Sequence, residues 1–207
     1  MYDQQELEKL RTLLSRGEIK AIAFDFDDTI WPLMPGWQRS LWVLPLLEWY
    51  LFGSAWTVML LPGLLPYYWP LREHMQAVKK ELGYIASQYP VAICSNTITP
   101  RLHWILWAMG LAALFPVNLR LGRNLVKRWR GKPHSALFDL LCERLELQPN
   151  QILFLDNTSR NIQAAGRLGF YTLLVDDDRA SKAWKKASAR APDFVAALRL
   201  LHQASTS

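Results

Sequence analysis

The sequence has few cysteines and lacks the apolar leader of an exported protein. Its 207 residues include only 2 Cys, Cys94 and Cys142, and they show no metal-site spacing. We therefore favour buried free thiols in a reducing compartment over a disulfide. Residues 1–8 are acidic and contain no signal-peptide core, so we expect a cytoplasmic location. Repeats, low-complexity tracts and recognised nucleic-acid-binding modules are also absent, and we expect no nucleic-acid partner.

Composition indicates a folded chain with an uneven distribution of positive charge. Charged residues make up 20% and apolar residues 51%, which argues against disorder, and 207 residues fit one domain with a substantial core. The formal net charge is +6. The basic residues concentrate in two groups. Such groups fit a solvated face beside an anion-binding site, or alternatively a surface that binds anionic lipid or phosphorylated substrates. The clustered residues are Arg120, Arg123, Lys127, Arg128, Arg130 and Lys132, followed by Arg179, Lys182, Lys185, Lys186 and Arg190.

Apolar runs and helical periodicities alternate along most of the chain. Strands are predicted at 19–24, 91–94, 151–155 and 171–175. Helices are predicted at 4–16, 71–88 and 134–146; a further helix runs to Gly169, and closing helices extend to about 203. Thr99, followed by a proline, is expected to cap a further helix that stops at Gly110. The alternation predicts an α/β fold, a three-layer Rossmann-like parallel sheet. Residues 204–207 are expected to form a flexible tail.

Polar residues follow three of the predicted strands at the point where each ends. Because the carboxyl ends of parallel strands border one crevice, we expect these side chains to converge. The carboxylates of Asp25 and Asp27 are two residues apart and so lie on the same side of the chain. Because two negative charges this near to each other repel, they favour a divalent cation bound between them. The residues concerned are Asp25 and Asp27, Ser95 and Asn96, and Asp156 and Asn157.

With these residues placed, the chain resembles the haloacid dehalogenase (HAD) superfamily of aspartate-nucleophile phosphatases. The signature regions occur in order: residues 25–29 (DFDDT), the strand ending at Ser95, Lys132 within 131–134 (GKPH), and residues 156–161 (DNTSRN). Residues 29–32 (TIWP) and 154–157 (FLDN) look most like the small magnesium-dependent phosphatases. The resemblance therefore implies an Mg²⁺-dependent phosphatase.

The resemblance also implies roles for the first motif. Asp25 would attack phosphorus and form an aspartyl phosphate, and Asp27 would protonate the leaving oxygen and then activate water. A dehalogenase would not need the second carboxylate, so Asp27 favours phosphoryl transfer. Thr29 would orient the nucleophile loop. Mg²⁺ would bind Asp25, the backbone carbonyl of Asp27 and the fourth motif.

The other motifs would bind phosphate and complete the metal site. Ser95 and the backbone at Asn96 would hold phosphate oxygens, and Lys132 would neutralise charge on phosphate and nucleophile. The fourth motif departs from the common glycine-aspartate pattern, because Asp156 is followed by Asn157. We interpret Asn157 as the metal ligand and Asp156 as a supporting residue, the reverse assignment being the alternative. A neutral amide ligand would weaken Mg²⁺ binding.

Residues 31–70 form a separate, tryptophan-rich block between the first two motifs. The block holds Trp31, Trp37, Trp42, Trp49, Trp56 and Trp69, and Glu48 is its only charge between residues 41 and 65. A single membrane crossing here would separate Asp25 from the later motifs, so we exclude a transmembrane span. We expect a small, mostly helical hydrophobic cap on a core made of residues 1–30 and 71–203. The alternatives are a dimer interface and a surface that contacts the membrane.

Three functional hypotheses follow. The leading one is an Mg²⁺-dependent phosphomonoester hydrolase acting on a phosphorylated small molecule with an apolar or aromatic part. The second is a membrane-peripheral lipid-phosphate phosphatase, similar to a phosphatidylglycerophosphatase. The third is a catalytically weak protein that binds a phosphorylated ligand or acts as a scaffold through its apolar insertion. Independently of these hypotheses, the apolar insertion is a candidate homodimer interface.

Overall fold

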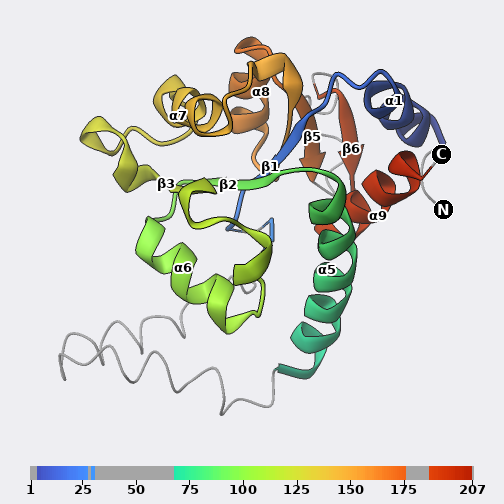
Figure 1. Ribbon diagram of the computed structural model, residues 1–207, viewed down its shortest axis with the longest axis horizontal. Helices are drawn as coiled ribbons and strands as arrows, with labels where there is room; N and C mark the ends of the chain where they lie inside the picture. The colour runs from blue at the N-terminus through green and yellow to red at the C-terminus, as the bar shows by residue number, and fades with distance from the viewer. Residues whose placement is uncertain (1–3, 28, 31–67, 176–186, 207) are drawn as a thin grey trace.

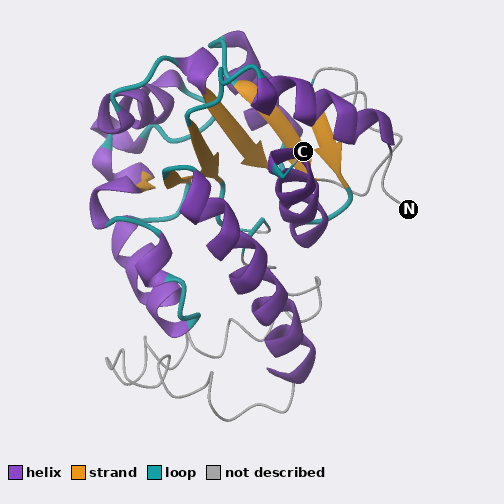
Figure 2. Ribbon diagram, turned by 45° about the vertical axis from the view of Figure 1, so that its right-hand side comes forward, coloured by secondary structure: helices purple, strands orange, loops and turns teal. Residues whose placement is uncertain are grey.

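The computed structural model describes residues 4–27, 29–30, 68–175 and 187–206. Over these residues the strands form one parallel six-stranded sheet in the order β3-β2-β1-β4-β5-β6. Helices cover both faces, as Figures 1 and 2 show. The predicted α/β, three-layer Rossmann-like class is therefore confirmed. The strands are β1 (Ala21–Phe24), β2 (Val91–Ser95), β3 (Arg120–Gly122), β4 (Ile152–Asp156), β5 (Tyr171–Val175) and β6 (Ala189–Ala191).

The helices occupy the connections that a parallel sheet requires. The α-helices are α1 (Gln4–Ser15), α5 (Tyr68–Gln88), α6 (Thr99–Ala108), α7 (Ser135–Leu145), α8 (Ser159–Arg167) and α9 (Phe194–Ser205). Short 3₁₀ turns are η3 (Ala112–Leu114), η4 (Val117–Leu119), η5 (Arg123–Leu125), η6 (Lys127–Trp129) and η7 (Pro149–Gln151). Among the helices of the described ranges, none combines the length and apolarity needed to cross a membrane.

Alternation of side chains along the strands divides the core into two layers. In β1, Ile22 and Phe24 pack into the layer under α1, α5, α6 and α9, whereas Ala23 packs into the layer under α7 and α8. Phe24 makes edge contacts with Phe115 and Phe194 on its side of the sheet. All residues of β1 are buried, so this central strand holds rigidly the loop that follows it.

Several sequence predictions differ in detail from the structure. β3 and β6 were not predicted, because three-residue edge strands carry too short an apolar pattern. Thr99 begins α6, but it does not cap it: the capping position is Ile98, and the Thr99 hydroxyl donates to Asn124 Oδ1 at 3.1 Å. Gly110, at φ +66°, follows the helix end as predicted.

The predicted domain limits also change at two places. The expected flexible tail at 204–207 is wrong for Ala204 and Ser205, which belong to α9; Ala204 is buried in the core. Residues 68–70 belong to α5 rather than to the cap insertion. The proposed cap itself, over residues 31–67, lies outside the described residues, as does Asp28.

Candidate active site

The predicted nucleophile, Asp25, is the first residue after β1, and the sheet holds its backbone. Its amide N–H donates to Leu155 O of β4 at 2.8 Å, which extends the β1–β4 pairing by one residue. Asp156 ends β4, directly beside Asp25 in the sheet order. The register of two central strands therefore brings the first and fourth motifs together, although 131 positions separate these residues (156 − 25).

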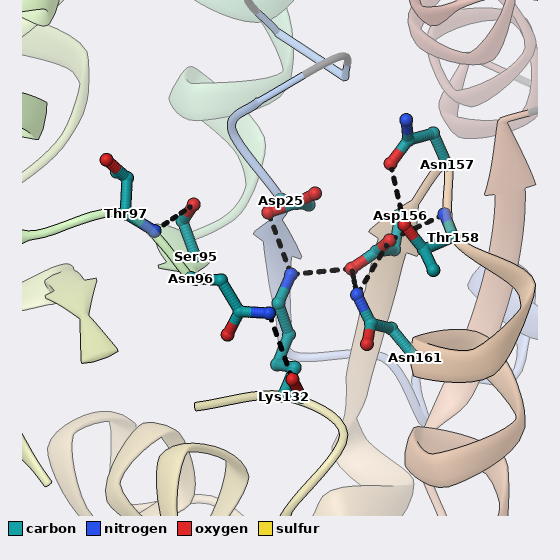
Figure 3. A network of polar contacts seen from close by, with 9 residues as sticks. All are labelled: Asp25, Ser95, Asn96, Thr97, Lys132, Asp156, Asn157, Thr158 and Asn161. Carbon is teal, nitrogen blue, oxygen red and sulfur yellow. Dashed lines mark hydrogen bonds and ion pairs between the residues drawn. The ribbon is translucent and has the colours of Figure 1, made fainter. Parts of the chain in front are cut away.

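Lys132 joins these two carboxylates. Its ammonium lies 2.8 Å from Asp25 Oδ1 and 2.5 Å from Asp156 Oδ2, and its side chain is fully buried. Figure 3 shows this ammonium between the two carboxylates. The same ammonium lies 5.0 Å from the centre of the Phe154 ring, a cation–π contact. The third motif is thus fixed in place by the first and fourth.

Burial and charge shift the pKa values of these groups in opposing ways. Burial raises the pKa of Asp25 to about 7, with Lys132 acting against the shift and Asp156 adding to it. Burial also pushes the pKa of Lys132 down, but the attraction of Asp156 and Asp25 outweighs this and the net shift is upward. The lysine therefore stays charged, and two carboxyl groups share this one buried ammonium.

Asp156 uses all its acceptor capacity within the protein. In addition to Lys132, its carboxylate accepts from Thr158 N at 2.7 Å and from Asn161 Nδ2 at 2.9 and 3.2 Å, and the residue has no exposed surface. Asn157, half-buried, accepts from the Thr158 hydroxyl at 3.2 Å. The geometry thus suits Asp156 as a residue that positions Lys132, and the assignment of Asn157 as the metal ligand stays a prediction.

The second motif contributes Ser95 and Asn96 at the end of β2. Ser95 is buried, and its hydroxyl accepts from Thr97 N at 3.2 Å. The Asn96 side chain turns towards the third motif: its Nδ2 donates to the Lys132 carbonyl at 2.9 Å, and its Oδ1 lies against Gly131. Figure 3 shows this orientation. The side chain of Asn96 therefore holds the loop that carries Lys132, a contact that sequence reasoning did not predict.

Asp27 and Thr29 continue the loop after Asp25. Asp27 is half-buried, and its Oδ1 lies 3.5 Å from Arg101 Nη2. Thr29 is buried; its amide donates to Phe26 O at 3.3 Å, and its hydroxyl has no hydrogen-bond partner within the described residues. The orienting role of Thr29 remains a prediction.

Three residues near the site were not assigned roles from the sequence. Asn161 binds both oxygens of Asp156, and its signal was its place in the first turn of the helix after β4. Arg101 reaches Asp27, from the first turn of the helix after β2. Arg120, grouped above with a solvated basic face, is instead buried, and its guanidinium donates to the carbonyls of Phe115 and Ala112.

The donor set at this crevice fits a hard divalent cation. Within the described residues no cluster of three or more His, Cys, Asp or Glu side chains is arranged as a metal site. Oxygen donors of other kinds are present, however: the Asp25 carboxylate, the Asn157 amide and the backbone carbonyl of Asp27. Mg²⁺ is bound in proteins by one or two carboxylates with carbonyl and water oxygens, which is the kind of donor present here.

Comparison with known proteins agrees with this geometry. Residues 129–199, which include the third and fourth motifs, match the HAD-hydrolase-like family model. The fold is that of the haloacid dehalogenase superfamily. The resemblance predicted from the motifs is thus confirmed at the level of the fold, and a HAD-like family model matches its third and fourth motifs, while the small magnesium-dependent subtype stays a prediction.

Solved structures across the superfamily share the fold at low sequence identity. A putative β-phosphoglucomutase from Bacteroides vulgatus has a TM-score of 0.64 at 15% identity, with 99% of this chain and 98% of that chain covered. A predicted phosphoglycolate phosphatase from Haemophilus somnus 129pt has a TM-score of 0.59 at 21% identity, with 88% and 98% covered. The L-2-haloacid dehalogenase from Xanthobacter autotrophicus has a TM-score of 0.58 at 17% identity, with 89% and 97% covered.

One curated sequence matches over a short segment. The mouse (Mus musculus) acyl-CoA dehydrogenase family member 10 is 42% identical over 45 residues. The match covers 22% of this chain and only 4% of the mouse protein. These relatives and neighbours include both phosphatases and dehalogenases, so they support a HAD hydrolase fold and leave the reaction to be argued from the site.

Proposed function

We propose that this protein is an Mg²⁺-dependent phosphomonoester hydrolase that works through phosphorylated Asp25. The observation that carries the proposal is the buried Lys132 ammonium, held within 2.8 Å of Asp25 and 2.5 Å of Asp156. A fixed cation at this point stabilises charge that develops on a phosphoryl group under attack by Asp25. It also keeps the attacking carboxylate oriented by a short ion pair.

In the first step, an Asp25 oxygen forms a bond to phosphorus as the bond to the leaving oxygen breaks. Asp27 donates a proton to that oxygen, and an alcohol leaves. In the second step, water attacks the phosphorus of the aspartyl phosphate while Asp27 accepts its proton. Asp25 is released as a carboxylate together with inorganic phosphate, so one water is consumed for each ester hydrolysed.

The remaining residues bind the phosphoryl group. Ser95 and the backbone at Asn96 lie at the end of β2 and can donate to phosphate oxygens, beside the Lys132 ammonium. When bound by Asp25, the carbonyl of Asp27 and Asn157, Mg²⁺ would neutralise phosphate charge and orient the group for in-line attack. Asn157 replaces a charged ligand by a neutral one, so we expect weak Mg²⁺ binding.

Asp27 favours phosphoryl transfer over halide displacement. A halide leaves as an anion and needs no proton, whereas an alkoxide requires one from a general acid. Asp27 is half-buried on the loop after the nucleophile, where it can supply that proton. Superfamily neighbours named as a phosphatase and a phosphoglucomutase are compatible with this choice, and the neighbour named as a haloacid dehalogenase defines the alternative to test.

We further propose a cytoplasmic location and a phosphorylated small-molecule substrate. Contact with a membrane surface, a homodimer and an apolar substrate portion all depend on residues 31–67, which lie outside the described residues. A lipid-phosphate substrate and a catalytically weak scaffold are the alternatives, and the turnover assay below separates the scaffold from an active phosphatase.

The proposal is tested by comparing wild-type protein with Asp25→Asn and Asp27→Asn variants. The substrate is p-nitrophenyl phosphate, assayed with Mg²⁺ and with EDTA. We expect Asp25→Asn to abolish turnover while the circular dichroism spectrum is retained. Because p-nitrophenolate leaves without a proton, Asp27→Asn should still form the aspartyl phosphate but hydrolyse it slowly. Mass spectrometry should then detect one added phosphoryl group on residues 25–27.

Two outcomes would contradict the proposal. Full turnover in Asp25→Asn would remove the nucleophile from the mechanism. Release of chloride from 2-chloropropionate by wild-type protein, with no hydrolysis of any phosphate ester, would show a dehalogenase instead.

A further inference from the structure

Arg101 lies beside the proposed general acid and belongs to none of the signature motifs. It stands in the first turn of α6, where its Nη2 is 3.5 Å from Asp27 Oδ1 and its Nη1 donates to the Thr97 hydroxyl at 3.2 Å. About a third of its side chain is exposed, 38%. A partly exposed arginine therefore lies beside the proposed general acid.

The backbone that carries Arg101 is rigidly held. Thr97 O accepts from Arg123 N at 3.0 Å, and Thr99 N donates to the Asn124 side chain at 2.7 Å. Gly122 N donates to the Thr99 hydroxyl at 3.2 Å, and Gly122 packs so closely on this turn that a Cβ would collide with the backbone of Thr97 and Thr99. These contacts fix the turn before α6 and so preorganise the start of the helix, which lowers the entropic cost of binding a ligand there.

The contact between Arg101 and Asp27 is long for an ion pair. A separation of 3.5 Å is longer than the roughly 2.7–2.9 Å of a charge-assisted hydrogen bond, so this ion pair is loose. Arginine has five N–H donors in a planar fork; within the described residues, Nη1 of Arg101 donates to Thr97 and Nη2 lies near Asp27. The fork matches a carboxylate or phosphate, which can accept two parallel hydrogen bonds.

If Asp27 protonates the leaving group as proposed, its contact with Arg101 puts the guanidinium near that group. A general acid must lie about 3 Å from the oxygen that it protonates. Arg101 Nη2 is 3.5 Å from Asp27 Oδ1, so with Oδ1 as the donating atom it lies within roughly 6.5 Å of the leaving oxygen. An acidic group two or three carbons from the ester oxygen can reach a donor at this range. Exposed basic residues of the segment after β3, Lys127, Arg128 and Arg130, add positive potential for anions.

We propose that Arg101 binds an oxyanion, a carboxylate or a second phosphate, carried by the alcohol portion of the substrate. The inference rests on the proposed phosphatase function and narrows its substrate class to phosphomonoesters of acidic or doubly phosphorylated small alcohols. Esters of neutral alcohols of the same size offer no oxyanion to the Arg101 guanidinium, so they are hydrolysed with a lower kcat/KM.

The experiment compares three esters of similar size: glycerol 3-phosphate, 3-phosphoglycerate and propane-1,3-diol bisphosphate. The first has a neutral alcohol portion, the second carries a carboxylate and the third a second phosphate. We expect Arg101→Gln to lower kcat/KM for the preferred acidic ester about 10- to 100-fold, the effect of losing a charged hydrogen-bond partner. The ratio of that kcat/KM to the value for glycerol 3-phosphate should fall at least about tenfold. Arg101→Lys keeps the positive charge but loses the planar fork, so its kcat/KM for the acidic ester should lie between the values for wild type and Arg101→Gln.

Arg144→Gln is the matched control, because it removes the same charge from an exposed position near the end of α7. It should leave the ratio between the esters as in wild type. If Arg101 only positions Asp27, Arg101→Gln will lower kcat for all the esters alike, and the proposal is then wrong.

A binding measurement separates this inference from the proposed function. Absence of hydrolysis of every ester, p-nitrophenyl phosphate included, would overturn the phosphatase but not the anion site. Calorimetric titration of Asp25→Asn protein with 3-phosphoglycerate, the bisphosphate and glycerol 3-phosphate then decides. The site is supported if either acidic ester binds more tightly than glycerol 3-phosphate and this preference is lost in the Asp25→Asn, Arg101→Gln double variant. Equal affinities for all three esters would refute it.

Discussion

Replacement of Lys132 by Met tests the buried charge arrangement at the centre of the site. The ammonium lies within 2.8 Å of both Asp25 and Asp156, and its side chain is fully buried. Breaking a buried ion pair by removing one partner costs about 3–5 kcal/mol, because an uncompensated charge remains. Asp156 keeps its hydrogen bonds from Thr158 and Asn161, so most of the cost falls on Asp25. We therefore expect a loss near the lower limit, about 3 kcal/mol.

The loss should depend on pH with a definite sign. Burial already raises the pKa of Asp25 to about 7 in wild type, where Lys132 acts against the shift, and without the ammonium this pKa should rise further above its value in the unfolded chain. Folded Lys132→Met protein then binds more protons than the unfolded chain, so its stability falls as pH rises. The difference from wild type should accordingly be larger at pH 8 than at pH 5.

Urea unfolding in EDTA-containing buffer, followed by circular dichroism, measures the effect without a divalent cation taking the lysine's place. With a slope of roughly 2 kcal/mol per molar urea, a loss of about 3 kcal/mol lowers the midpoint by roughly 1.5 M. Lys80→Met, at an exposed position of α5, should change stability by no more than about 0.5 kcal/mol. A Lys132→Met loss below about 1 kcal/mol at pH 8, or one equal at both pH values, would refute the reasoning.

Two further predictions concern the core that supports the site. Asp193→Ala removes the side chain that caps α9 through a 2.8 Å hydrogen bond from Ala196 N, so thermal or urea unfolding should show a loss of about 1 kcal/mol. For the thiols, burial raises the pKa of Cys94 to about 12 and that of Cys142 to about 11, with Asp139 adding to the latter. The thiolate is the form that reacts with iodoacetamide. Alkylation of the folded protein, followed by mass spectrometry, should therefore leave Cys94 unmodified and modify Cys142 faster as the pH rises towards 10. Rapid labelling of Cys94 in the folded protein at pH 7 would contradict this interpretation.

The local sequence was sufficient to locate the main strands and the edge of the sheet where the site lies. Each of the apolar runs before Asp25, Ser95 and Asp156 became a buried strand, because continuous apolar segments of this length must be covered on both faces. Their polar ends then meet at one edge, since the strands are parallel. The edge strands β3 and β6 were missed, because three residues give too short a pattern and their pairing depends on a sheet that is already formed.

Tertiary structure alone decided what the side chains around those strand ends do. Asn96 and Gly131 are 35 positions apart (131 − 96), and only the packing of the loop shows that Asn96 holds the backbone of Lys132. Arg120 is indistinguishable in sequence from its basic neighbours, yet it is buried on carbonyls, whereas Arg101 faces Asp27. The sequence by itself thus determined the order of the motifs and the type of sheet, because these depend on local apolar pattern. Long-range side-chain contacts, including the ion pairs of Lys132, depend on strand register and loop packing and became known only from the fold.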